Sequence, residues 1–207
     1  MILTIEYHTS SRDYLKRAKA KLKEGTLESL FYAAFELRCG IEQRMREYLE
    51  AWDHVYEKKK QGWRVPELGR TIDHTFKLGD KVARFTITSD KKDKIYGVFY
   101  YTPVSSELKE MAGRIGNYLH AFREYKPPAD EWWNETRTYL ENVYVELRKA
   151  CSGTLLGAPL VSPDGEMSMP MQFDEKAAEI KELGMGGQVI MTVEYLDEYP
   201  SELDLAT

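Results

Sequence analysis

Residues 26–58 read TLESLFYAAFELRCGIEQRMREYLEAWDHVYEK, and this stretch decides the fold. Apolar residues recur in it at steps of three and four, which is the spacing of one face of an α-helix. Thr26 can cap this helix, and Glu28 suits the positive end of its dipole. The apolar face consists of Leu27, Leu30, Ala34, Leu37, Ile41, Met45, Tyr48, Trp52 and Val55. A face this long predicts burial against other helices or against a second copy.

Three further helices are predicted around the long one. The first occupies residues 10–25, where Ser10 supplies a helix-start signal. The second occupies residues 105–122. The third occupies residues 130–153, where Asp130 can cap the first turn after two prolines. Together these segments predict a bundle of four helices.

Strand-like segments interrupt and follow the bundle. An alternating pattern predicts an N-terminal strand over residues 2–8. An insert over about residues 66–103 is rich in Thr, Val, Ile, Phe and Tyr, which favours a three-stranded meander. Its predicted strands are residues 71–77, 81–88 and 94–102.

The C-terminal part returns to strands. The turn Ser162-Pro163-Asp164-Gly165 predicts a hairpin between residues 155–161 and 167–173. A short helix over residues 174–184 and a last strand over residues 189–195 follow, and this strand could pair with the N-terminal one.

The predicted fold class is therefore α+β: a four-helix bundle with an inserted β-meander and additional terminal strands. We expect residues 1–151 to form the bundle domain, and residues 152–207 to form a β appendage packed on it.

Composition narrows the class of protein further. The chain has 207 residues, of which 43% are hydrophobic, enough for a substantial core. Its two cysteines, Cys39 and Cys151, exclude a disulfide scaffold and suit a reducing compartment. Neither a membrane-spanning run nor a signal peptide is evident. We therefore expect a soluble cytoplasmic protein without a membrane association.

The charge is divided unevenly along the chain. Residues 1–126 carry a net charge of +6 and residues 127–207 a net charge of −11. Such asymmetry can indicate a basic surface that binds a polyanion, in a chain with a separate acidic region. The alternative is that the charged runs are simply exposed to solvent, which is more common.

The segment Arg114-Ile115-Gly116-Asn117-Tyr118-Leu119-His120 carries the candidate chemistry. If the predicted helix runs straight through it, Arg114, Asn117 and His120 share a polar stripe opposite the apolar face. Arginine binds phosphate oxygens, and histidine exchanges protons near neutral pH. These groups suit attack by an RNA 2′-hydroxyl on the adjacent phosphorus, a reaction that needs no metal or cofactor. The alternative is an ordinary solvated helix surface.

This arrangement resembles the HEPN superfamily, in which the third helix of a four-helix bundle carries an Arg, a few intervening residues and a His. The segment of residues 31–42 on the long helix also resembles HEPN-like proteins of bacterial defence systems. The resemblance covers roughly residues 9–151 without the insert. It implies a homodimer whose two motifs face each other across the subunit interface, and in many members a metal-independent ribonuclease of toxin–antitoxin or phage-defence systems.

The resemblance assigns roles to individual residues. Arg114 and His120 match the motif, with five residues between them. Asn117 is polar but not adjacent to the arginine, where the family often has a polar residue and this chain has Ile115. Glu36 would be the acidic helper from the long helix; the alternative is an ordinary surface carboxylate.

Three functions follow as hypotheses. The first is a dimeric, metal-independent endoribonuclease acting on RNA as a toxin or defence effector. The second is a non-catalytic interaction or nucleotide-binding subunit, which could engage a protein partner such as an antitoxin. The third is an oligomeric structural protein whose seam is the long helix. No spacing of His, Asp or Glu suggests a metal site.

Overall fold

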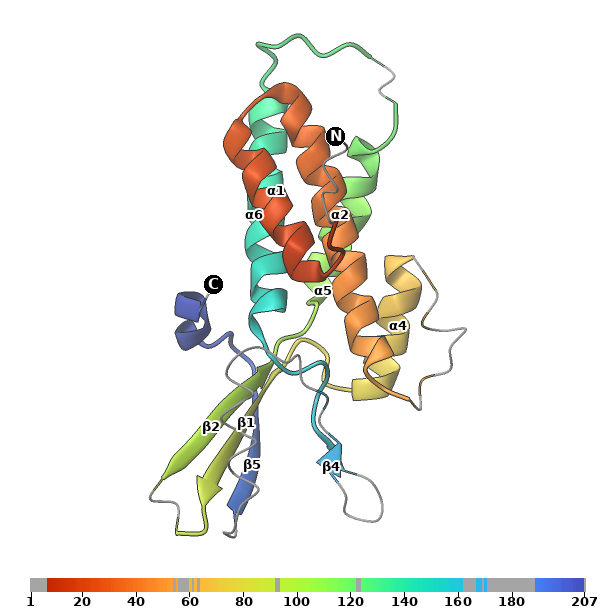
Figure 1. Cartoon of the computed structure of the whole chain (residues 1–207). Helices are drawn as coiled ribbons and strands as arrows, with labels where there is room; N and C mark the ends of the chain where they lie inside the picture. The colour runs from red at the N-terminus through yellow and green to blue at the C-terminus, as the bar shows by residue number, and fades with distance from the viewer. Residues whose placement is uncertain are drawn as a thin grey trace, which may run out of the picture.

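The chain forms a bundle of helices above a small antiparallel sheet (Figure 1). The computed structural model describes residues 7–53, 55, 60, 62, 64–91, 94–121, 124–161, 167–168, 170 and 189–206. Its α-helices are α1 (Ser11–Glu24), α2 (Leu27–Glu50), α4 (Val65–Phe76), α5 (Ser106–Ile115) and α6 (Trp132–Ser152). Its strands are β1 (Val82–Ser89), β2 (Ile95–Tyr101), β3 (Leu160–Val161), β4 (Met167–Ser168) and β5 (Val189–Leu196). This mixture confirms the α+β class.

The four predicted helices are α1, α2, α5 and α6, and they pack together around one core (Figure 1). The apolar face of α2 is its centre, because Leu37, Ile41 and Met45 are fully buried. From α6, Leu140, Val143 and Leu147 join the same core, as their helical spacing predicts.

The predicted helix starts are confirmed at the level of single hydrogen bonds. The side chains of Ser10, Thr26 and Ser105 accept hydrogen bonds from backbone N–H groups in the first turns of α1, α2 and α5. The carboxylate of Asp130 accepts one from the backbone N–H of Trp132 at 3.0 Å. Each bond satisfies a donor that the helix itself leaves unpaired.

Helix α2 is shorter than predicted. It ends at Glu50 rather than near residue 58, yet Trp52 and Val55 remain buried beyond it. The indole N–H of Trp52 donates to the carbonyl oxygen of Leu156 at 3.0 Å. The chain therefore leaves the helix while its apolar side chains stay in the core, so helical spacing alone placed the end too late.

The predicted strand over residues 71–77 is wrong, because α4 covers this segment apart from its last residue. Pro66 in the first turn favours a helix start. The residues Val65, Leu68, Gly69, Ile72 and Phe76 are buried at helical spacing. The many β-branched and aromatic residues favoured a strand, but burial of this face against α2 and α5 outweighs that preference.

The sheet combines the insert with the C-terminal strand, in the order β2-β1-β5. Phe85 at its centre pairs with Phe99 of β2 and Val193 of β5. The predicted three-stranded meander is thus corrected to a hairpin, and β5 supplies the third strand. β5 pairs with β1, while its predicted pairing with the N-terminal strand involves residues that lie outside the described ones.

Several predicted elements lie partly or wholly outside the described residues. Of the N-terminal strand, only Tyr7 and His8 are described, and they belong to no helix or strand. The C-terminal hairpin is present as the short pair β3 and β4, and its turn lies outside the described residues. The predicted helix over residues 174–184 also lies outside them.

A buried polar cluster joins the bundle to the sheet. The guanidinium of Arg44, fully buried on α2, donates to the carbonyl oxygens of Ala150 at 2.9 Å and Gly153 at 3.0 Å. The hydroxyl of Thr102 also donates to the carbonyl oxygen of Ala150, at 2.9 Å, and the hydroxyl of Tyr48 donates to the carbonyl oxygen of Thr102. The donors of Arg44 and Thr102 satisfy the last carbonyls of α6 and meet the negative end of its dipole.

Burial also makes this cluster sensitive to alkaline pH. It raises the pKa of Tyr48 to about 12 and that of Tyr101 well above its usual value. In the unfolded chain these phenols ionise near pH 10. We therefore expect the contribution of both phenols to stability to be intact below pH 10 and to fall above it at about 1.4 kcal/mol per pH unit for each phenol, until Tyr48 ionises in the folded state near pH 12.

Urea unfolding at pH 8, 10 and 11 measures this dependence. Tyr48→Phe should show a shallower fall above pH 10 than the parent chain, whereas Tyr125→Phe, at an exposed position, should not. An unfolding free energy that stays constant from pH 10 to 11 would contradict the prediction.

Candidate functional site

The motif segment is not a single straight helix. Helix α5 ends at Ile115, and a 3-10 turn, η1 (Gly116–Tyr118), continues the chain. The predicted straight helix through His120 is therefore wrong, because Leu119 and His120 lie beyond the 3-10 turn. The side chains of Arg114, Asn117 and His120 are all exposed, but they do not share one stripe, since Arg114 lies against α6 and His120 lines a groove beside α2.

Arg114 lies against α6. The central carbon of its guanidinium is 4.5 Å from the ring centre of Tyr139, a cation–π contact. The hydroxyl of Tyr139 donates to the carbonyl oxygen of Met111 at 2.7 Å, which fixes the ring. Burial raises the pKa of Tyr139 to about 12, against the opposing effect of Arg114, so the ring stays neutral at physiological pH.

His120 lies on a different side of the segment. It lines a groove of about 700 Å³ between α2 and the chain around η1. Its lining also includes Phe31, Tyr32, Phe35, Glu36 and Leu119. Tyr32, Phe35 and Leu119 are 61, 48 and 40% exposed, so the groove has an unusually apolar wall for a surface.

Glu36 lines the same groove from α2. Its carboxylate accepts a hydrogen bond from the Nε of Arg17 at 2.8 Å, and the hydroxyl of Tyr7 lies 3.5 Å from its Oε1. The guanidinium of Arg17 lies over the rings of Tyr7 and Tyr14, at 4.1 and 4.6 Å. The carboxylate of Glu36 at the edge of the groove is thus fixed by its ion pair with Arg17 rather than freely solvated.

The predicted site residues therefore do not all lie together in the structure. It brings His120 and Glu36 to one groove and places Arg114 on Tyr139. Asn117 lies on η1, and its side chain forms no hydrogen bond within the described residues. The sequence reading missed Arg17. Its contact with Glu36 could have been predicted from the turn between α1 and α2. Arg17 and Glu36 lie at similar distances along the chain from Gly25, on the two helices that this turn joins.

The cysteines do not contribute to the site as nucleophiles. Burial, with Glu42 and Glu36 nearby, raises the pKa of Cys39 to about 11, and burial also raises the pKa of Cys151. At pH 8 only about one Cys39 in a thousand would be ionised, and the thiolate is the reactive form.

We expect both thiols to react with a disulfide reagent at least about 10-fold more slowly in the native protein than in urea. Absorbance of the released thiol at pH 8 measures this rate. Native-state labelling of Cys39 as fast as that of a free cysteine would contradict it.

Within the described residues, no group of three or more His, Cys, Asp and Glu side chains is placed to hold a metal ion. None of the described helices combines the length and apolar character that crossing a membrane requires.

Comparisons with protein-family models, with curated proteins and with solved structures found no match for this chain.

Proposed function

We propose that this protein is a HEPN-like endoribonuclease that acts as a dimer and needs no metal. The observation that supports this best is the groove between α2 and η1, where the imidazole of His120 and the carboxylate of Glu36 line one exposed cavity. An imidazole that can accept a proton, with a carboxylate lining the same groove, is a combination that proton transfer at RNA can use.

In the proposed reaction, His120 accepts the proton of an RNA 2′-hydroxyl. The 2′-oxygen then bonds to the adjacent phosphorus, and the bond to the 5′-oxygen breaks. Water supplies a proton to this leaving oxygen, so the products are a 2′,3′-cyclic phosphate and a 5′-hydroxyl. Arg114 stabilises the negative charge that develops on the phosphorane.

A dimer is part of the proposal because one subunit does not bring its arginine and its histidine to the same place. Within one chain, Arg114 lies on the α6 side of the motif segment and His120 on the α2 side. A second copy packed against this face would bring the arginine of one subunit to the histidine of the other. The exposed apolar side chains Tyr32, Phe35 and Leu119 favour such a covered face.

A second function is a non-catalytic interaction subunit, and two contacts favour it. Arg114 is engaged by Tyr139, and Glu36 is engaged by Arg17, so neither group is free for substrate within one subunit. On this alternative the apolar groove would receive a protein partner, such as an antitoxin, and RNA would remain intact.

The first experiment incubates the protein with single-stranded RNA in EDTA. Arg114→Ala and His120→Ala should each abolish cleavage, while His74→Ala, at an exposed position on α4, should not change it. Dependence on added metal, or equal cleavage by all variants, would reject the proposal. Growth arrest on expression, relieved by His120→Ala, would support a toxin or defence role.

A further inference from the structure

Helix α1 concentrates positive charge in a chain whose net charge is −5. It carries six Lys and Arg side chains and two carboxylates. Lys16, Lys19 and Lys23 follow one another at steps of three and four, and all three are exposed. They therefore form one stripe along the outer face of α1, here called the lysine stripe.

The two carboxylates of α1 form no ion pair with this stripe in the part of the chain that the structure describes. Asp13, one turn before Lys16, keeps its charge and accepts a hydrogen bond from the hydroxyl of Ser10, and Glu24 pairs with Lys21 at 2.7 Å. Within the described residues, none of the three stripe lysines forms an ion pair with a carboxylate. Three charged ammonium groups are thus available on one face.

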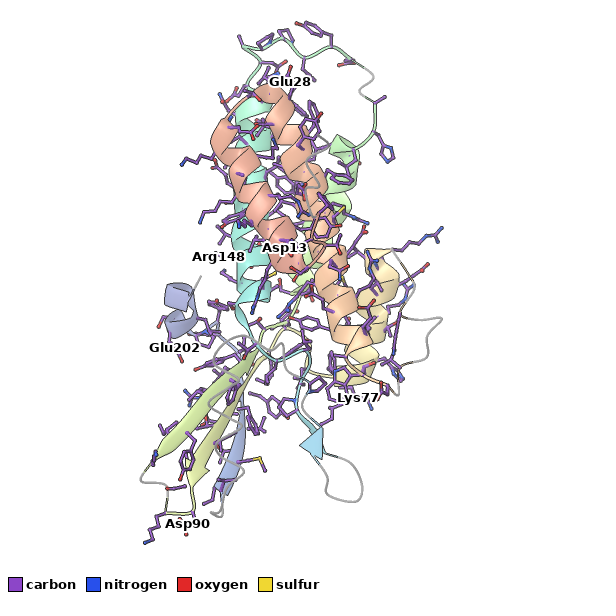
Figure 2. The ribbon with its side chains drawn as sticks, viewed as in Figure 1. Asp13, Glu28, Lys77, Asp90, Arg148 and Glu202 are labelled. Atoms are coloured by element: carbon purple, nitrogen blue, oxygen red, sulfur yellow. The ribbon has the colours of Figure 1, made fainter. Side chains whose placement is uncertain are left out.

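Neighbouring cations extend the same positive surface. Arg12 binds the carbonyl oxygens of Cys151 and Gly153, and Arg137 of α6 binds those of Leu22 and Gly25. Figure 2 shows Arg148 on α6, the helix that contacts α1, at about the height of Asp13. Glu141 of α6 is an exposed counter-charge on this side.

We propose that the lysine stripe is the track on which the protein holds the phosphate backbone of its RNA, an inference that rests on the proposed ribonuclease function. Successive stripe lysines are separated by about 4.5 and 6 Å along the helix axis. Flexible point charges at this spacing can follow a chain of phosphates without reading its sequence.

The composition of α1 favours RNA over a membrane or a protein. A helix that lies on a membrane presents large apolar side chains next to its lysines. In α1, Leu15 and Leu22 instead pack in the bundle, and the exposed residue between the lysines is the small Ala20. Lysine is also depleted from protein–protein interfaces.

The lysine stripe lies close to the groove that His120 lines. Arg17 and Lys21 lie on the flank of α1 that faces α2, where Arg17 binds Glu36 and the Lys21 ammonium lies 5.7 Å from the ring centre of Tyr32. Both Glu36 and Tyr32 line the groove of His120. A strand held on the lysine stripe would need to cross only the width of one helix, about 10 Å, to reach it.

The test measures binding of the full chain to a single-stranded 2′-O-methyl RNA, which lacks the attacking hydroxyl and cannot be cleaved. The variant combines Lys16→Gln, Lys19→Gln and Lys23→Gln. The control combines Arg70→Gln, Lys91→Gln and Lys94→Gln, exposed cations on α4 and the β1–β2 hairpin that remove the same charge. Circular dichroism checks that both variants stay folded.

We expect the stripe variant to bind about 100-fold more weakly at 0.1 M salt and to lower the slope of log affinity against log salt by about 2. The control should keep the parent slope. Equal losses in both variants, or no RNA binding by the parent chain, would overturn the proposal. So would stripe-dependent binding to phosphatidylserine vesicles without RNA binding.

The outcomes separate this inference from the proposed function. If the parent chain binds through the stripe but cleaves no RNA, the nuclease proposal fails and the track stands. If cleavage depends on His120 while the stripe variant keeps parent affinity and slope, the track fails and the nuclease proposal stands.

Discussion

Replacing Arg44 with methionine is expected to lower the free energy of unfolding by about 3–5 kcal/mol. The guanidinium of Arg44 is fully buried and binds the carbonyl oxygens of Ala150 and Gly153 as well as Glu47, at 3.2 Å. Methionine has similar length but no donor. Glu47 would keep only its bonds to the backbone N–H and hydroxyl of Ser11, and the end of α6 would lose its central cation.

Thermal and urea unfolding measure this loss. For a chain of this size, the expected change lowers the melting temperature by roughly 10 °C. Arg70→Met is the matched control, because Arg70 is exposed on α4 and its replacement should cost no more than about 0.5 kcal/mol. A melting temperature for Arg44→Met within 2 °C of the control, about 1 kcal/mol or less, would show that the cluster does not hold α2 to α6.

Removing the imidazole of His120 is expected to reduce RNA cleavage by about 100- to 10,000-fold, the range that general acid–base catalysis supplies. Because His120 is exposed and lines an open groove, free imidazole should reach the vacated position. Cleavage by His120→Ala should therefore return in part when imidazole is added to the assay.

This rescue distinguishes catalysis from structure. His120→Gln, which keeps a polar side chain of similar size but cannot take up the proton, should be as inactive as His120→Ala. Arg114→Ala should not be rescued by imidazole, since it lacks a cation rather than a base. A His120→Gln variant with full activity would remove the histidine from the reaction.

The parts of the fold that were predictable are those that local sequence determines. The side chains of Ser10, Thr26 and Ser105 cap the helices whose starts they predict, and Leu37 and Ile41 are buried as their spacing requires. These features depend on a few neighbouring residues and on helical periodicity, both of which a sequence displays directly.

The parts that failed depend on contacts distant in sequence. Helix α4 replaces a predicted strand because Leu68 and Ile72 pack in the core that α2 and α5 share, and β5 joins β1 across about a hundred residues. The burial of Arg44 in a polar cluster was not predicted, since its partners Ala150 and Gly153 belong to the end of α6, far away in the sequence. Contacts between residues so distant in the sequence leave no local sequence pattern from which they could be predicted.

The candidate site was predictable only as a set of residue types. His120 and Glu36 do share one groove, but Arg114 packs on Tyr139 of α6 instead, and the helix that was expected to carry all three motif residues ends at Ile115. A straight-helix projection could not reveal this change. It also explains why the proposed chemistry requires two subunits.

Mixing two inactive variants tests this requirement most directly. Arg114→Ala and His120→Ala subunits are exchanged by dilution and reconcentration, and RNA cleavage is then measured in EDTA. If the motifs of two subunits build one site, mixed dimers retain one arginine and one histidine there, and cleavage reappears above the level of either variant alone. If mixing produces verified mixed dimers but no gain in cleavage, a site composed from both subunits is contradicted.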